Sequence, residues 1–183
     1  MDASLALAPP AISWSLGLDH SVTVRPIRPE DANLELAFLR ALSPQSLYNR
    51  VFTARPALTP AGLERLVRID FARDMAIIAT VALDGSENQI AVARYVRLED
   101  GSTAEFAVTI ADAWQGCGVG SRLLRELIDI AGRSGIREMV GDVLATNKAM
   151  LALARKLGMR TEIHPDGATL RLVRLTLPAV ADA

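Results

Sequence analysis

The sequence predicts one domain of the α/β class (α+β type) with a mixed central sheet whose first strands are antiparallel. Near residue 75 the hydrophobic pattern changes from helical spacing to nearly continuous apolar runs. Asp-Gly turns punctuate these runs, which is typical of antiparallel hairpins. After residue 114 helical and strand patterns alternate. The length of 183 residues suits one domain with a sizeable core.

Composition excludes several classes of function. Hydrophobic residues make up 50% and charged residues 22%, as in folded globular proteins. The net charge of -1 argues against a nucleic-acid or anionic-membrane partner, and no apolar run has membrane-spanning length. One cysteine and two distant histidines provide neither a disulfide framework nor a metal-site pattern. We therefore predict no bound metal. Since the N-terminus lacks the basic region of a signal peptide, we also predict a cytoplasmic location.

The first half of the chain is expected to be mainly helical. Residues 1–20, which include two consecutive prolines, are interpreted as a tail or arm, and residues 21–183 as the single domain. The Thr59-Pro60 pair is a typical helix start. The elements expected are a strand over 22–27, helices over about 31–42 and 43–52, and a helix from 59 to about 70.

The second half should contain most of the sheet. Three strands are predicted as an antiparallel meander, followed by a helix after the glycines near residue 118, a strand, a helix and a C-terminal hairpin. The predicted strands are 75–83, 89–98, 103–110, 139–144, 159–164 and 168–177, and the second helix runs from Asn147 to Gly158.

The stretch W-Q-G-C-G-V-G-S at residues 114–121 indicates a backbone that approaches a phosphate. Glycines that only relieve strain in a turn before a helix are the simpler explanation. A P-loop is excluded, because no Gly-Lys-Ser/Thr follows at the required spacing. A Rossmann fingerprint is disfavoured, because Ser121 stands where its last glycine belongs and the loop follows a meander.

The pattern Q-x-x-G-x-G at 115–120, after a strand and before a helix, resembles the coenzyme A diphosphate loop of the GNAT N-acetyltransferases. The segment A-T-N-K-A-M-L-A-L-A-R-K-L-G-M (145–159) is similar to the second motif of that family. The stretches at 24–31, 42–52, 69–76 and 103–108 resemble the Pat-type protein lysine acetyltransferases. The likeness covers about residues 22–177 and implies a GNAT fold, with helices on both faces of the sheet and splayed strands 103–110 and 139–144.

The resemblance implies acetyl-CoA as the cofactor and identifies the residues that hold it. Backbone groups late in strand 103–110 would pair with pantetheine, and successive N–H groups of the glycine loop would hold the diphosphate. Gln115 would bind or brace the loop, and Asn147 would contact pantetheine, cap the following helix, or both. The predicted cofactor-binding residues are Val108, Thr109, Ile110, Gln115, Gly116, Cys117, Gly118, Val119, Gly120, Ser121 and Asn147.

Glu105 is the predicted catalytic residue. Only about one lysine in a thousand is neutral at physiological pH, so amine acetylation benefits from a general base. Glu105 is an acid in an otherwise apolar strand, and it matches the acid that Pat-type enzymes use as base. An exposed acid on a half-buried strand is the alternative explanation. Alternation places Glu105, Ala107 and Thr109 on one face unless a bulge intervenes.

The sequence departs from the family pattern at a position where many members carry a tyrosine that protonates the leaving thiolate. Ala154 occupies this position. Either Tyr48 or Tyr95 would have to substitute, or no general acid is needed. Cys117 lies in the cofactor loop and is interpreted as a small filler rather than a nucleophile.

These features predict an enzyme that transfers the acetyl group of acetyl-CoA to an amine by direct attack, with a protein lysine as the favoured acceptor. A small-molecule amine is the nearest alternative, because one fold accepts many substrates. A non-catalytic acyl-CoA-binding regulatory module is the second alternative. Whether the chain forms a homodimer stays open.

Overall fold

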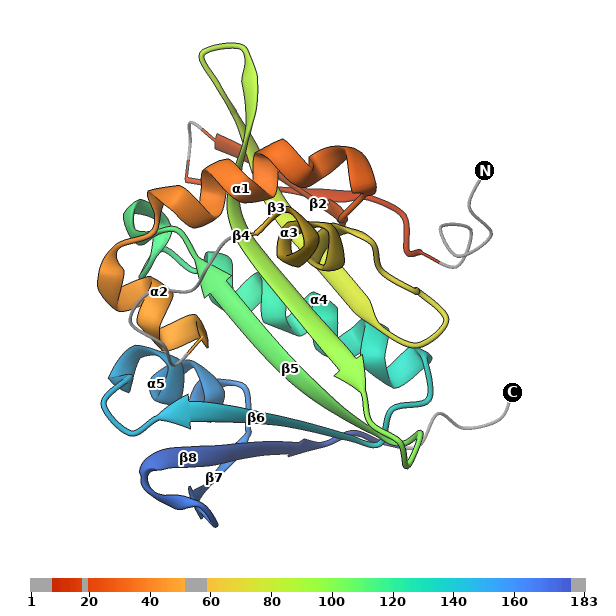
Figure 1. Cartoon of the computed structure of the whole chain (residues 1–183), viewed down its shortest axis with the longest axis vertical. Coiled ribbons are helices and arrows are strands. Elements are labelled where there is room, and N and C mark those ends of the chain that lie inside the picture. Colours follow the sequence, from red (N-terminus) through yellow and green to blue (C-terminus); the bar gives the residue numbers. More distant parts are fainter. Residues whose placement is uncertain (1–7, 18–19, 52–58, 179–183) are drawn as a thin grey trace.

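The computed structural model describes residues 8–17, 20–51 and 59–178, which form an eight-stranded mixed sheet with helices on both faces (Figure 1). The described residues up to 67 contain β1 (Ile12–Leu16), β2 (His20–Pro26), α1 (Ala32–Ala41), α2 (Pro44–Val51) and α3 (Pro60–Val67). From residue 75 onward follow β3 (Met75–Leu83), β4 (Ser86–Arg97), β5 (Thr103–Ile110), α4 (Val119–Arg133), β6 (Glu138–Leu144), α5 (Lys148–Lys156), β7 (Arg160–His164) and β8 (Gly167–Thr176). Short 3-10 helices cover Pro29–Asp31 and Asp112–Trp114.

The strand order in the sheet is β1-β2-β3-β4-β5-β6-β8-β7. All neighbours are antiparallel except β5 and β6, which run parallel. The predicted meander of β3, β4 and β5 is therefore confirmed. Asp84 (φ 49°) and Gly85 (φ 76°) form the turn between β3 and β4, and positive φ at both central residues is what a two-residue hairpin loop requires.

Strand β1 was not predicted, because the sequence analysis assigned residues 1–20 to a tail or arm. Residues 12–16 pair with β2 along their whole length and form one edge of the sheet. The ring of Trp14 lies 5.0 Å from the guanidinium carbon of Arg122, and Arg122 Nη1 donates a hydrogen bond of 3.1 Å to the carbonyl of Ser15. This strand therefore contacts the first turn of α4, close to the glycine loop.

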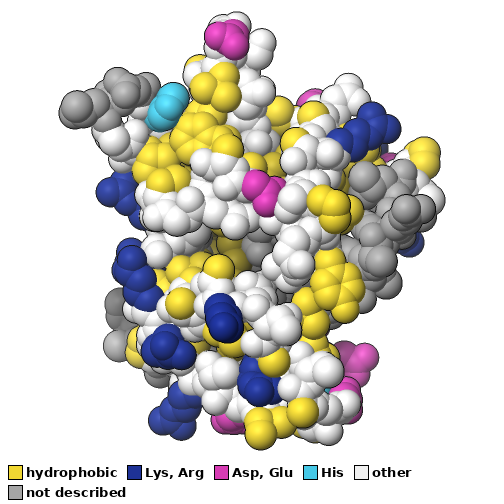
Figure 2. Space-filling view, turned by 90° about the vertical axis from the view of Figure 1, so that its left-hand side faces the viewer, with side chains coloured by type: hydrophobic (Ala, Val, Ile, Leu, Met, Phe, Trp, Pro, Cys, Tyr) yellow, Lys and Arg dark blue, Asp and Glu magenta, His cyan; other side chains and the backbone are white. Residues whose placement is uncertain are grey.

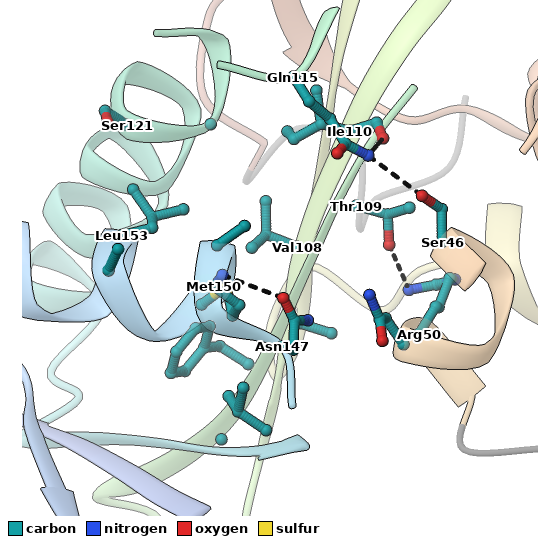
Figure 3. A pocket seen from close by; sticks show the side chains of 18 of the residues that line it. Ser46, Arg50, Val108, Thr109, Ile110, Gln115, Ser121, Asn147, Met150 and Leu153 are labelled. Atoms are coloured by element: carbon teal, nitrogen blue, oxygen red, sulfur yellow. Dashed lines mark hydrogen bonds between the residues drawn. The ribbon is translucent and has the colours of Figure 1, made fainter. Parts of the chain in front are cut away.

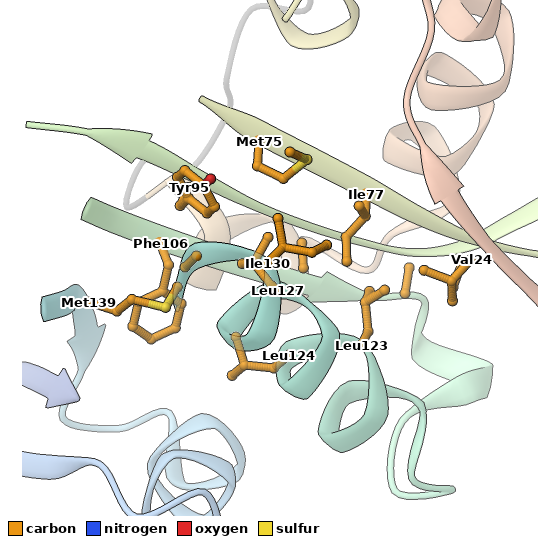
Figure 4. Close-up of a cluster of buried hydrophobic side chains, with 14 of the residues drawn as sticks. Val24, Met75, Ile77, Tyr95, Phe106, Leu123, Leu124, Leu127, Ile130 and Met139 are labelled. Atoms are coloured by element: carbon orange, nitrogen blue, oxygen red, sulfur yellow. The ribbon is translucent and has the colours of Figure 1, made fainter. Parts of the chain in front are cut away.

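The larger hydrophobic core lies between the sheet and α4 (Figure 4). Leu123, Leu124 and Leu127 are completely buried because their spacing of three and four residues gives α4 one apolar face. They pack against Ile77 and Tyr95 from the strands. Burial of a leucine side chain contributes about 1.5–3 kcal/mol to folding, so this face holds α4 and the preceding loop on the sheet.

A second core covers the opposite face, where Figure 1 shows α1 and α3 in front of the sheet. Phe38 and Leu39 of α1 and Val67 of α3 pack here against Ile78 and other buried strand residues. Thr59 caps α3 by accepting a hydrogen bond from the backbone N–H of Gly62 at 3.1 Å, as the Thr-Pro pair predicted.

A buried ion pair fixes the entry into α1. Arg25 of β2 donates two hydrogen bonds to Asp31, at 2.7 and 2.8 Å, and the backbone N–H of Arg28 donates a third at 2.8 Å. Both charged side chains are only 10% exposed. Burial raises the pKa of Asp31, but the hydrogen bonds from Arg25 and Arg28 outweigh this effect and lower the pKa below its ordinary value.

Replacing Asp31 by Asn should destabilise the protein by about 2–3 kcal/mol at neutral pH, because it leaves the Arg25 charge buried without its main partner. Since folding lowers the pKa of Asp31, the carboxylate stabilises the protein above the unfolded value of 3.8, and this contribution is lost as the pH falls through the folded pKa. Urea denaturation of the unmodified protein and of Asp31→Asn should therefore give free energies of unfolding whose difference becomes smaller below about pH 4. A difference that stays constant over this range would contradict the assignment.

Candidate active site

The candidate site is the cleft that opens where β5 and β6 part. The two strands pair over only three positions, from Thr103 with Glu138 to Glu105 with Val140. Beyond Glu105, β5 pairs with β4 alone, while β6 pairs with β8. The resulting cleft has a volume of about 540 Å³, and Figure 1 shows the strands diverging toward α2 and α5. The predicted splaying of these two strands is confirmed.

Gly141 lies at the point where the strands diverge. A Cβ atom at this position would lie 3.0 Å from the Phe106 ring and 3.1 Å from the Phe106 carbonyl oxygen. These distances are shorter than ordinary contacts, so a side chain here would displace Phe106 or β6. The sequence signal was an isolated glycine within a strand pattern, which typically marks a close approach of two backbones. The sequence analysis did not use it.

The glycine loop leads directly into α4. Gly116 (φ 77°) and Gly118 (φ 95°) have backbone conformations that L-residues rarely adopt, and Gly118 is the N-cap residue of the helix. The first hydrogen bond of α4 runs from the N–H of Arg122 to the carbonyl of Gly118, at 3.2 Å. The preceding N–H groups, those of Val119, Gly120 and Ser121, have no acceptor within the helix. The loop therefore presents donors and the positive end of a helix dipole.

Side chains of this segment point in different directions. Val119 is completely buried in the core, so it offers the cleft only its backbone. At Gly120 a Cβ atom would contact Leu153 of α5 and Ile110 of β5, at 3.4 and 3.5 Å. Cys117 is exposed, with its thiol 2.8 Å from the Trp114 carbonyl, so the expectation that it fills space in the loop is wrong.

Gln115 braces the loop. Its side-chain nitrogen donates to the Ile110 carbonyl and to the Ser46 hydroxyl, both at 3.1 Å. The side chain thus links the end of β5 to α2, and the Ile110 carbonyl already has one partner. Figure 3 shows Gln115 and Ser46 facing each other at one end of the cleft.

Asp112 holds the start of α2 in the same region. It accepts hydrogen bonds from the Ser43 N–H at 2.9 Å, the Ser43 hydroxyl at 2.6 Å and the Ser46 hydroxyl at 2.8 Å. Desolvation raises the pKa of Asp112, but these donors outweigh it and lower the pKa below its ordinary range. Together Asp112 and Gln115 attach α2 to the loop after β5, so α2 forms one wall of the cleft.

Asn147 caps α5 and lines the cleft. Its side-chain oxygen accepts a hydrogen bond from the Met150 N–H at 3.1 Å. Figure 3 places Asn147, Met150 and Leu153 on the side of β5 opposite to α2. The side-chain nitrogen of Asn147 makes no hydrogen bond to the described residues and can serve a ligand in the cleft.

Glu105 lines the cleft at the end where β5 and β6 still pair. No register shift interrupts the pairing of β5 with β4, so Glu105, Ala107 and Thr109 share one face, as predicted. Phe106 points to the opposite face, into the core beneath α4. Glu105 is exposed, and its neighbour across the strand pair is Val96, which is 50% exposed.

No tyrosine lines the described part of the cleft. Tyr95 is 2% exposed within the α4 core, where burial raises its pKa, and Tyr48 lies on the exposed surface of α2. Ala154, at the family's tyrosine position, is completely buried in α5. Neither tyrosine suggested from the sequence therefore reaches the site.

Basic side chains gather on the α5 side. Lys156 lines the cleft, and Lys148 and Arg155 are exposed on the same helix, which contains no acidic residue. Figure 2 shows a hollow across this face of the molecule, with Lys and Arg side chains below it. Lys156 was not among the predicted site residues, although the sequence shows it in a predicted helix that contains no acidic residue.

Comparison with known proteins identifies the family. The model of the acetyltransferase (GNAT) domain matches residues 21–160. The chain belongs to the GNAT acetyltransferase family. GNAT enzymes use acetyl-CoA, and the chain is accordingly an acetyl-CoA-dependent N-acetyltransferase. None of the described helices is long and apolar enough to cross a membrane.

Individual GNAT relatives resemble most of the chain. It is 37% identical to acetyltransferase PA5475 of Pseudomonas aeruginosa, over 90% of this chain and 89% of that protein. It is 35% identical to acetyltransferase Pat of Mycolicibacterium smegmatis, over 74% of this chain but only 40% of Pat. The crystal structure of the GNAT domain of S. lividans PAT superposes with a TM-score of 0.82 at 27% identity, over 91% of this chain and 97% of that one.

Replacing Gly118 by Ala should weaken acetyl-CoA binding about tenfold, measured as Kd by isothermal titration calorimetry. An alanine at this φ costs about 1–2 kcal/mol, which the loop would relieve by rotating its N–H groups.

Gly101 provides the matched control, because its φ of 70° is also positive, its Cβ would meet no atom, and it lies in the β4–β5 turn. Gly101→Ala should lower stability by a similar amount and leave the Kd unchanged. Equal Kd values for Gly118→Ala and the unmodified protein would contradict the role of the loop.

Proposed function

We propose that this GNAT enzyme acetylates lysine side chains of proteins, with Glu105 as the general base. The observation that carries the proposal is the position of Glu105. It is an exposed acid at the point where β5 and β6 part, beside an open strand face that a long side chain can reach. The similarity to the Pat proteins favours a protein acceptor over other amines.

The cleft residues fit the chemical groups of acetyl-CoA. The N–H groups from Gly116 to Ser121 are donors for the diphosphate, and Lys156 adds a positive charge to the same cleft. The backbone of β5 beyond Glu105 lacks a strand partner on its β6 side, so the backbone groups of Val108 are free to pair with the amides of pantetheine. The alternation of an antiparallel pair directs the backbone groups of Thr109 to Val92 of β4 instead, so Thr109 lines the cleft with its side chain. Asn147 would bind the same arm through its side-chain nitrogen. Ile110 contributes less, since Gln115 already occupies its carbonyl.

Acetyl-CoA supplies the acetyl group as a thioester, which a neutral amine attacks directly. Glu105 accepts the proton that the lysine ammonium must lose, and a positioned base of this kind contributes about 10²–10⁴-fold to the rate. No protein acid is required at Ala154, because a CoA thiolate leaves without prior protonation. Turnover therefore does not require a tyrosine in the described part of the cleft.

A small-molecule amine is the second candidate acceptor, because the cleft has charged walls as well as an open mouth. The cytoplasmic location predicted from the sequence remains part of this proposal.

Replacing Glu105 by Gln should lower kcat/KM for a lysine-containing protein or peptide about 100-fold or more, because the isosteric amide cannot accept the proton. Thiol release from acetyl-CoA measures this rate. The Kd for acetyl-CoA should not change, and the residual activity should rise with pH as more of the lysine becomes neutral.

Glu99 offers a matched control, since it is an exposed glutamate in the turn after β4, outside the cleft. Glu99→Gln should retain full activity. Undiminished kcat/KM in Glu105→Gln would remove Glu105 from the mechanism, whereas turnover of small amines without any protein acceptor would favour the second candidate.

A further inference from the structure

Two arginines lie on the same side of the sheet as the strand face that carries Glu105. Arg50 comes from the last turn of α2 and lines the cleft, and Arg94 comes from β4, where it lies opposite Ala107. Because residues paired across antiparallel strands share a face, Arg94 is on the Glu105 side of the sheet. The two cations are therefore on the side of β5 from which we expect the acceptor to approach.

Among the described residues, Glu35 is the one carboxylate whose charge acts on both arginines, and only Arg94 contacts it. Arg94 Nη2 lies 3.2 Å from an oxygen of Glu35, whose side chain is completely buried and also accepts a hydrogen bond from Gln89. Arg50 forms no ion pair with a described residue, and its one hydrogen bond there is a long contact of 3.4 Å to the Thr109 hydroxyl. Two positive charges and one negative charge leave the group one positive charge in excess.

Several observations indicate that this pair of arginines can bind an anion. The side chain of Arg94 is 13% exposed, and its Nε is buried with no hydrogen-bond acceptor among the residues that the structure describes. Burial and the nearby charge of Arg50 lower the pKa of Arg94, and the charge of Glu35 raises it in part. The resulting pKa of Arg94 is about 10. Burial likewise lowers the pKa of Arg50. A partly desolvated cation with only a hydroxyl partner costs free energy that a bound anion would offset.

Figure 3 shows on which side of β5 the Arg50 side chain lies. Arg50 reaches from α2 toward Thr109, on the opposite side of β5 from the α5 residues Met150 and Leu153. Arg50 therefore contacts the strand face that carries Glu105 and lies away from the α5 wall of the cleft. Glu105 and Thr109 are four residues apart on one strand face, a distance of about 13 Å.

We propose that Arg50 is a specificity-determining residue that binds a carboxylate of the acceptor, so that the enzyme prefers lysines accompanied by an acidic residue. This inference rests on the proposed function, because it takes the acceptor to be a protein lysine deprotonated by Glu105. In an extended chain an acidic residue two to four positions from the lysine spans about 7–13 Å. Guanidinium binds carboxylate in a bidentate manner, which would fix the direction of the bound chain.

The test compares peptides that contain one lysine and differ only in a glutamate or a glutamine, placed in turn at each position up to four residues from the lysine. With the unmodified enzyme, glutamate should raise kcat/KM about tenfold at one or two positions. Arg50→Gln should abolish this preference and retain acetyl-CoA affinity and thermal stability. Arg40→Gln, a matched change at an exposed arginine of α1 outside the cleft, should keep the preference.

The outcomes separate this inference from the proposed function. Absence of a glutamate preference in the unmodified enzyme, or its persistence in Arg50→Gln, overturns the role of Arg50 even if lysine peptides are good substrates. If no peptide is acetylated, the proposed function fails, and free lysine is compared with lysine amide on both proteins. A preference for free lysine that Arg50→Gln removes then supports carboxylate binding by Arg50, and equal rates overturn it.

Discussion

The short parallel pairing of β5 and β6 is the constraint on which the rest of the structure depends. After Glu105 the two strands separate, and the backbone of β5 is left without a partner on one side in the middle of the sheet. Unpaired backbone groups inside a protein are costly unless water or a ligand satisfies them. Gly141 allows β6 to pass close to Phe106 at the point of separation, and the cleft follows from this geometry.

The two sides of the cleft differ in the groups that they present. The α4 N-terminus, the glycine loop and α5 present N–H donors and basic side chains, which suit the phosphates of the donor. On the other side, Asp112 and Gln115 hold α2 against the loop, so that Arg50 faces the strand face of Glu105. Because the same loop holds α2 and leads into α4, the proposed cofactor site and the proposed acceptor site share one support.

The sequence predicted the parts of this arrangement that depend on local pattern. Glycines before an amphipathic helix, and an asparagine before a second one, identified the loop at Gly118 and the cap at Asn147, because both depend on nearby residues. Contacts across long separations were not predictable, since no local pattern records them. Arg50 contacts Thr109, which is 59 residues away in the sequence, and Trp14 contacts Arg122, which is 108 residues away. Strand β1 is a different case, because Ile12–Leu16 alternates apolar and polar residues and pairs with the next strand along the chain. It was missed because residues 1–20 were interpreted as a tail or arm.

We propose that the unpaired side of β5 holds acetyl-CoA and directs its thioester toward Glu105. A crystal structure with acetyl-CoA bound tests this claim most directly. We expect pantetheine between β5 and β6, hydrogen-bonded to the backbone of Val108, with the diphosphate at the N–H groups of residues 116–121. Acetyl-CoA bound outside the cleft, or β5 and β6 paired along their whole length, would contradict it.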